Sequence, residues 1–221
     1  MQTRSAVASS KDSYSDPISL WVKLAYTAFV IVLVPVYWLE YGPENFLWAS
    51  DIALLLTLVA LWMESALLAS MIALAILLPE LAWSIDFFYR LAFGVDAVRL
   101  LGTQYMFNPE LPLLVRGLSL FHVALPALLL WLVYRLGYER RALIYQTALA
   151  WIVLPASYWL TEPAANINWV RGFGREPQDW MPAPVYLVLL MIAMPLILYV
   201  PTHLVLKRFL AIDGVGVRAR L

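Results

Sequence analysis

The chain of 221 residues contains no cysteine and little charge. Without cysteine there is no disulfide framework, no thiolate metal site, no cysteine nucleophile and no redox-active Cys-x-x-Cys motif. Charged residues make up 14% of the chain, whereas soluble domains typically carry about 25%. The 15 basic and 15 acidic side chains cancel, so no excess positive charge is available for nucleic acid. These deficits exclude a soluble globule and a nucleic-acid-binding protein.

Histidine is almost as scarce as cysteine. The chain has two histidines, and no H-x-x-x-H or E-x-x-H pair accompanies them. Such pairs are the usual way in which helices present imidazole ligands to a metal. We therefore expect neither a metal ion nor a cofactor.

Long apolar runs are what the chain has in abundance, with 63% hydrophobic residues and a mean hydropathy of +0.76. A membrane-spanning helix needs about 20 predominantly apolar residues. The run from Phe46 to about Phe93 is too long for one crossing, so we expect it to fold back at Met63-Glu64-Ser65. The sequence predicts an all-α, polytopic bundle of six transmembrane helices, at about 20–39, 46–63, 66–90, 112–134, 142–160 and 184–206.

The chain ends differ from this apolar part. Residues 1–17 are polar and rich in serine, and are expected to form a disordered cytoplasmic tail. The first apolar run is longer than a typical signal-peptide core and no small-residue cleavage site follows it, so we expect a retained span. The transmembrane domain is predicted over residues 18–207 and a cytoplasmic C-terminal tail over 208–221.

The positions of Lys and Arg predict the orientation, because short cytoplasmic loops are enriched in these residues. With the N-terminus inside, the inner segments carry ten basic residues: Arg4, Lys11, Lys23, Arg135, Arg140, Arg141, Lys207, Arg208, Arg218 and Arg220. The outer segments carry five: Arg90, Arg99, Arg116, Arg171 and Arg175. We expect a multi-pass protein of the cell (inner) membrane with both termini cytoplasmic.

Two outer connections are longer than a turn requires. Residues 91–111 mix apolar and charged positions at helical spacing and are expected to form a short amphipathic helix at the interface. Residues 161–183 combine a Gly172-Phe173-Gly174 hinge with three prolines and form a candidate lid. Asn166 and Asn168 of this loop would face the same cavity in an extended segment, with Trp169 as an interfacial anchor. An Asx-turn after Pro163 is an equally good interpretation.

Four ionisable side chains lie inside predicted spans, where each costs at least about 2.5–3.5 kcal/mol to insert. They are Asp51, Glu80, Asp86 and His122. The predicted topology places Asp51, Asp86 and His122 in the outer half of the bundle and Glu80 nearest the middle, and Tyr158 at the outer end of its helix could join them. The sequence thus predicts a polar site that opens toward the outer leaflet.

Each of these residues also has a structural interpretation. Asp51 lies at a helix start, where the helix dipole favours a carboxylate. Asp86 precedes Arg90 by four residues and can form an ion pair on one helix face. Glu80 follows a proline and can bind backbone groups freed by the kink or stay protonated through desolvation. His122 can simply hydrogen-bond a neighbouring helix.

Several features resemble a known group of proteins. The six spans, the Phe121-His122-Val123 stretch, the basic turn from Arg135 to Arg141 and the motif around Trp180 and Tyr186 are similar to uncharacterised bacterial integral membrane proteins of the YwaF-like group. More remotely, the chain resembles the androgen-induced family of membrane hydrolases. That resemblance implies hydrolysis of lipid esters with His122 as a catalytic residue, and it aligns residues 46–51 with the segment that carries a threonine nucleophile. Trp48 occupies the threonine position, and Ser50 lies two residues away.

The first functional hypothesis is an intramembrane enzyme that hydrolyses or transfers acyl groups of a lipid, with His122 as general base. Ser50 or Ser119 would be the nucleophile, Asp51 or Asp86 would orient the imidazole, and Asn168 would stabilise an oxyanion. The residues expected to bind the substrate are Glu80, Tyr158, Asn166, Asn168 and Trp169.

The second hypothesis is a non-catalytic membrane protein that binds a lipid, a pigment or a partner subunit in the same cavity. A proton-coupled transporter is a weaker third option, because the inner half lacks a matching polar path. Under either main hypothesis the expected partners are membrane lipids, together with an apolar small molecule or a membrane subunit, and not nucleic acid.

Overall fold

The computed structural model describes residues 18–96, 102–174 and 176–210. Within these ranges every regular element is helical and no strand occurs. The elements are α1 (Leu20–Tyr41), η1 (Pro43–Leu47), α2 (Ala49–Met63), α3 (Ala66–Phe93), η2 (Thr103–Phe107), α4 (Leu113–Leu118), α5 (Phe121–Leu136), α6 (Ala142–Leu160), η3 (Pro163–Ala165), η4 (Ile167–Trp169), α7 (Ala183–Met194), η5 (Pro195–Tyr199) and α8 (Val200–Leu210).

The prediction of an all-α polytopic membrane protein is confirmed. Among the described residues, five helical segments are long and apolar enough to cross a membrane: Leu20–Tyr41, Ala66–Phe93, Leu113–Leu136, Ala142–Leu160 and Ala183–Leu210. The sixth apolar helix, α2, is shorter, with 15 residues. The chain folds back between α2 and α3 at Glu64, which adopts a left-handed backbone, and Ser65, whose side chain caps α3 by accepting from Leu68 N.

Some boundaries differ from the prediction. Residues 46 and 47 belong to the 3-10 turn η1 and not to the following span. The predicted span 112–134 consists of α4 and α5, which are separated at Ser119 and Leu120. The last helix continues to Leu210, so residues 208–210 are helical and not part of a tail. The predicted tail 1–17, most of the predicted C-terminal tail and the centre of the predicted amphipathic helix, 97–101, lie outside the described residues.

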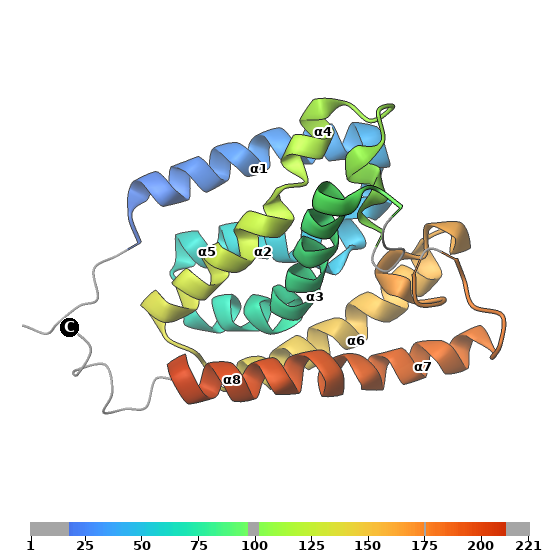
Figure 1. Ribbon diagram of the computed structural model, residues 1–221. Helices are drawn as coiled ribbons and strands as arrows, with labels where there is room; N and C mark the ends of the chain where they lie inside the picture. Colours follow the sequence, from blue (N-terminus) through green and yellow to red (C-terminus); the bar gives the residue numbers. More distant parts are fainter. Residues whose placement is uncertain (1–17, 97–101, 175, 211–221) are drawn as a thin grey trace, which may run out of the picture.

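Helix α3 occupies the centre of the bundle and packs against α2, α5, α6 and α8 (Figure 1). The buried residues of its first half include Ala69, Ser70 and Ala73, all with no exposed surface. Small side chains allow membrane helices to approach closely without a hydrophobic driving force between them. By contrast, Leu187 is the one side chain of α7 that is buried, so most of this helix faces outward with apolar side chains.

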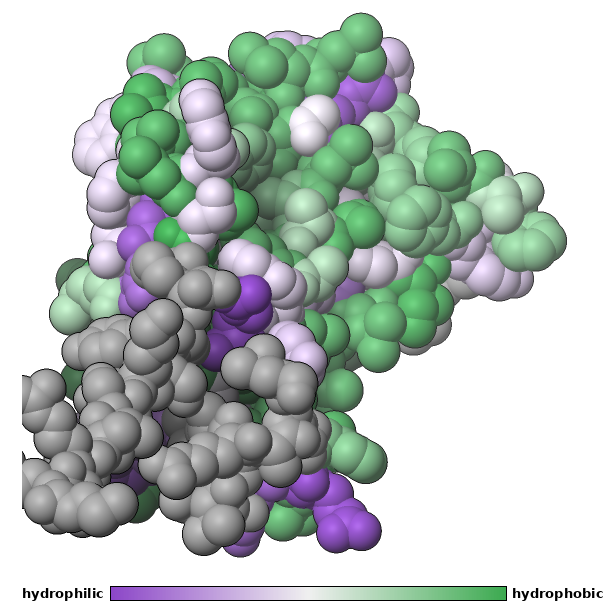
Figure 2. Space-filling model, turned by 90° about the vertical axis from the view of Figure 1, so that its left-hand side faces the viewer, coloured by the Kyte–Doolittle hydropathy of each residue, from purple (hydrophilic) through white to green (hydrophobic). Residues whose placement is uncertain are grey.

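The six helical passes alternate in direction, so α1 begins and α8 ends at the same end of the bundle, on the left of Figure 1. Lys23, Glu64 and Lys207 lie at this end, which we call the terminal end. Figure 2 looks onto it and shows hydrophilic side chains between apolar surfaces. There Glu64 accepts from Lys23 Nζ at 2.6 Å and from Ile18 N at 3.1 Å, which ties α1 to the α2–α3 turn. The opposite end, where α1 finishes at Tyr41 and α7 begins at Ala183, is called the far end below.

Candidate functional site

A histidine and a glutamate from adjacent helices form the centre of the site. His122 is in the first turn of α5, and its Nδ1 lies 2.7 Å from Oε2 of Glu80 on α3. The imidazole is sandwiched between aromatic rings, because Trp83 stacks on it at a centroid distance of 4.6 Å and Phe121 at 4.1 Å. The Glu80 side chain is 3% exposed and the His122 side chain 14%. The histidine is therefore held in one orientation and keeps some accessible surface.

Asp51 completes a set of three titratable side chains. It lies in the first turn of α2 and is 4% exposed. His122 and Glu80 are the basic and acidic groups that act on it electrostatically, so the three residues share one region at the far end. Its Oδ1 is buried and has no hydrogen-bond partner among the described residues. We call Asp51, Glu80 and His122 the acid–base site.

Hydroxyl groups surround the acid–base site. Tyr37 of α1 and Ser119 share a hydrogen bond of 2.6 Å, and Ser119 Oγ also donates to the Val115 carbonyl at 3.1 Å. Because the serine proton is directed to that carbonyl, Tyr37 is the donor to Ser119. The Tyr41 hydroxyl is buried without a partner among the described residues. The Ser119 oxygen is thus engaged by Tyr37 and Val115, which does not favour its predicted role as a nucleophile activated by His122.

Tyr105 reaches the same region from η2, outside the spanning helices. Burial raises the pKa of its phenol, partly offset by interaction with Ser119. The hydroxyl consequently stays protonated at any physiological pH. Ser50, the other predicted nucleophile, precedes Asp51 in the chain and is half-buried, and its hydroxyl interacts with the Asp51 carboxyl.

Asp86 belongs to a different polar group. Its Oδ2 lies 3.1 Å from Arg90 Nε, 2.5 Å from Thr103 Oγ1 and 3.3 Å from Thr103 N. Arg90 also donates to the Val95 carbonyl. The predicted Asp86–Arg90 ion pair is present, and it fastens the connection after α3 to that helix. The carboxylate in contact with the imidazole comes from Glu80, which the sequence had assigned to substrate binding, and not from Asp86.

The asparagines of the 161–183 loop have structural partners. Neither is extended, because Asn166 has φ 42° and Asn168 has φ 54°, both in the left-handed region. Asn166 donates to the carbonyls of Gly172 and Gly174 and accepts from Arg171 N. The two side chains therefore do not face one common cavity as the extended interpretation required.

Asn168 connects this loop to α2. Its Oδ1 accepts from Ala49 N at 2.8 Å, and its Nδ2 donates to the Leu47 carbonyl at 2.7 Å and to Ser157 Oγ at 3.0 Å. All the hydrogen-bonding groups of the amide are engaged, so the predicted oxyanion donor has no free N–H.

The two aromatic residues predicted for substrate binding also lie in this loop region. Trp169 packs on Phe173 at 4.7 Å between ring centroids. Tyr158 lies under the Arg171 guanidinium at 4.1 Å, and its carbonyl accepts from the same side chain at 2.6 Å. Both residues therefore hold the loop together.

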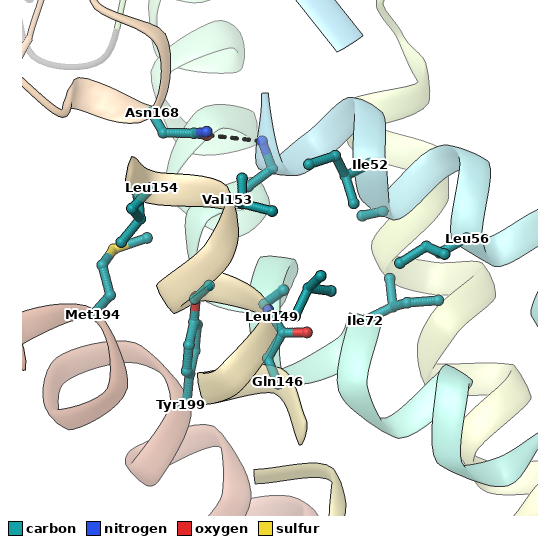
Figure 3. Close-up of a pocket in the computed structure, with 14 residues that line it drawn as sticks. Ile52, Leu56, Ile72, Gln146, Leu149, Val153, Leu154, Asn168, Met194 and Tyr199 are labelled. Atoms are coloured by element: carbon teal, nitrogen blue, oxygen red, sulfur yellow. Dashed lines mark hydrogen bonds between the residues drawn. The ribbon is translucent and has the colours of Figure 1, made fainter. Parts of the chain in front are cut away.

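A small, partly open pocket with a cavity volume of about 30 Å³ lies between α2, α3, α6, η4, α7 and η5. Figure 3 shows Ile52 and Leu56 on one side, Leu154 and Met194 on the other, and Asn168 at the top. Gln146 and Tyr199 add polar atoms to an otherwise apolar lining. The sequence did not predict this pocket, because its lining comes from six elements whose relative rotation no local pattern indicates.

The fold and these sites define a class: an all-α multi-pass membrane protein with a buried acid–base site. Within the described residues, no group of three or more His, Asp or Glu side chains is arranged to hold a metal ion. No family model, curated protein or solved structure matches the chain.

Proposed function

We propose that the protein is an intramembrane hydrolase that cleaves an ester of a membrane lipid, with His122 as general base. The supporting observation is the 2.7 Å contact between His122 Nδ1 and the buried Glu80 carboxylate. A carboxylate at Nδ1 favours the tautomer with its proton on Nδ1, so Nε2 carries the free electron pair, and it also stabilises the imidazolium that forms during the reaction.

Water is the nucleophile in this proposal, because Ser119 Oγ is engaged by Tyr37 and Val115. His122 Nε2 removes one proton from water as the oxygen attacks the ester carbonyl carbon. The tetrahedral intermediate then expels the alcohol oxygen, which takes up a proton. The products are a carboxylic acid and an alcohol, and the remote resemblance to membrane lipid hydrolases agrees with this reaction class.

The test compares the two histidines of the chain. Purified full-length protein is assayed against glycerolipid esters, and His122→Ala is expected to lower turnover about 10²–10⁴-fold, the usual contribution of a positioned general base. His203→Ala is the matched control, because His203 pairs with Tyr138 at the terminal end of the bundle. Equal turnover of His122→Ala and native protein, with both folded, would remove His122 from the mechanism.

The proposal includes a membrane orientation. Both chain ends are placed in the cytoplasm and the acid–base site toward the outer leaflet of the cell membrane. In support, Arg141 and Lys207 lie at the terminal end and carry charge into solvent or headgroups. At the far end, Arg90, Arg116 and Arg171 donate hydrogen bonds to carbonyls within the protein.

A second function is favoured by the apolar pocket of Figure 3. A protein that binds a lipid chain or a pigment needs an apolar lining with few polar groups, and Ile52, Leu56 and Leu154 supply that chemistry. The cavity of about 30 Å³ would have to widen to admit such a ligand. Native mass spectrometry of mildly extracted protein distinguishes the two functions. A stoichiometric co-purifying ligand without esterase activity would favour binding alone.

A further inference from the structure

We propose that Asp51 is a protonated carboxylic acid in the resting protein and that it donates the proton to the departing alcohol. This inference rests on the hydrolase function proposed above and assigns Asp51 a chemical role in the same site. It replaces the expectation that Asp51 orients the imidazole, because Glu80 already occupies His122 Nδ1.

The Asp51 carboxyl is buried but incompletely satisfied. The residue is 4% exposed, and Oδ1 has no hydrogen-bond partner among the described residues. An ionised carboxylate inside a protein normally accepts several hydrogen bonds, because an unpaired buried charge costs much more than a neutral group. Asp86 also has a buried oxygen without a partner, but Arg90 balances the charge of that carboxylate. Asp51 is in no ion pair with Lys or Arg among the described residues, so its orphan oxygen is better explained by the neutral form.

The structural role that the position of Asp51 suggests is carried out by another residue. An acid in the first turn usually binds backbone N–H groups at the helix start. Here Asn168 accepts from Ala49 N at the start of α2, and its amide also binds the Leu47 carbonyl. The start of α2 is thus capped from the 161–183 loop, and Asp51 is not needed for that purpose.

The charges at the far end do not balance if both carboxyls are ionised. Tyr37 and Tyr41 face Asp51 from α1, Tyr105 from η2, Glu80 from α3 and His122 from α5. In the described part of the chain, His122 is the basic side chain that acts on Asp51. In the resting state His122 is neutral, as its role as general base requires, and its Nδ1 contacts the Glu80 carboxylate. A second ionised carboxyl next to Glu80 would add a like charge without a cation, so Asp51 keeps its proton.

This assignment closes the proton balance of the reaction. His122 takes a proton from water when the carbon–oxygen bond to the new hydroxyl forms. Asp51 gives its proton to the alkoxide oxygen as the ester bond breaks, and the proton on His122 then returns to the Asp51 carboxylate. Ester and water are consumed, acid and alcohol are formed, and both side chains regain their starting states.

Infrared spectroscopy of the full-length protein tests the protonation directly. At neutral pH we expect the carbonyl stretch of a protonated carboxylic acid, shifted in D₂O, in the native protein and in Glu80→Gln. The band should disappear in Asp51→Asn and persist in Glu139→Gln, the control acid at the terminal end. Absence of the band from the native protein, or its loss in Glu80→Gln and not in Asp51→Asn, would overturn the assignment.

The role as a proton donor has a separate kinetic test. Asp51→Asn should lower turnover of an alkyl lipid ester about 10²-fold or more, because the departing alkoxide needs a proton. Turnover of a nitrophenyl ester should stay close to native, since nitrophenolate leaves without one. An equal loss with both esters would indicate a structural role. If His122→Ala left hydrolysis unchanged, the hydrolase proposal would fail, whereas the infrared band would still decide whether Asp51 is protonated.

Discussion

At the scale of single residues, Asp51 and Asp86 are equally buried, but only Asp86 is paired with an arginine among the described residues. Asp86 accepts from Arg90 and Thr103 through one oxygen, whereas Asp51 has Glu80 and His122 as its titratable neighbours. The sequence predicted that Asp51, Glu80 and Asp86 lie inside the bundle, because long apolar runs surround them, but it did not predict the burial of Arg90. It did not identify which carboxylate meets His122, because that depends on how α3 is rotated about its axis.

The Asp86–Arg90 pair leads to a stability prediction. Arg90→Met should destabilise the folded protein by about 3–5 kcal/mol, because it leaves the Asp86 charge buried without its cation. The double variant Asp86→Asn with Arg90→Met should recover a large part of this loss, since no unpaired charge remains. Unfolding in mixed detergent micelles measures both. A single variant as stable as the native protein would contradict the prediction.

A matched control for that comparison lies at the terminal end. Glu139→Gln removes one partner of an exposed ion pair with Arg141, 3.1 Å apart. The Arg141 hydrogen bond lowers the pKa of Glu139, so any contribution of the pair is present above the usual glutamate pKa and lost as pH falls. Because solvent screens exposed pairs, we expect no measurable change in stability at neutral pH.

At the scale of elements, the predicted spans were close to the observed helices because hydropathy reports on length directly. The interruptions were not predicted. One interruption is the break between α4 and α5, where the chain packs on other helices. The other is the π-helical turn η5, which begins at Pro195, a residue that has no backbone N–H for a helical hydrogen bond. The 161–183 loop was predicted to be a candidate lid. Its hydrogen-bond partners lie far away in the sequence and were not predicted.

The loop contacts of Asn168 predict a local effect on α2. Asn168→Ala removes the acceptor of Ala49 N and should destabilise the protein by about 1–3 kcal/mol, the cost of leaving a buried backbone donor without its partner. Hydrogen exchange of the first amides of α2 should accelerate. Asn108→Ala is the control, because Asn108 caps only a nearby exposed turn through Glu110 N. Equal exchange at α2 in both variants would show that the loop does not cap this helix.

At the scale of the whole molecule, the two ends of the bundle differ in how their basic residues are used. Arg141 and Lys207 at the terminal end are exposed, whereas Arg90 and Arg171 at the far end are bonded within the protein. A count of basic residues could not separate exposed charges from those paired inside the protein, and Lys23 at the terminal end is of the second kind, paired with Glu64.

The orientation can be tested with single cysteines, since the chain has none of its own. Glu110→Cys and Asp179→Cys, both exposed at the far end, should react with a membrane-impermeant maleimide in intact cells. Arg141→Cys should react only after the membrane is opened, because the terminal end is expected to be cytoplasmic. The reverse labelling pattern would place the acid–base site on the cytoplasmic side.

The shortness of α2 has a consequence for the substrate. Fifteen residues extend about 22 Å, whereas the hydrocarbon core is about 30 Å thick. Its terminal end is tied to α1 through Glu64 and Lys23, and the loop carrying Asn168 lies over its start. In the proposed orientation α2 therefore starts several ångströms below the outer edge of the hydrocarbon core, and Asp51 lies deeper than the glycerol esters at that edge. A lipid would have to move inward to bring its ester to the acid–base site.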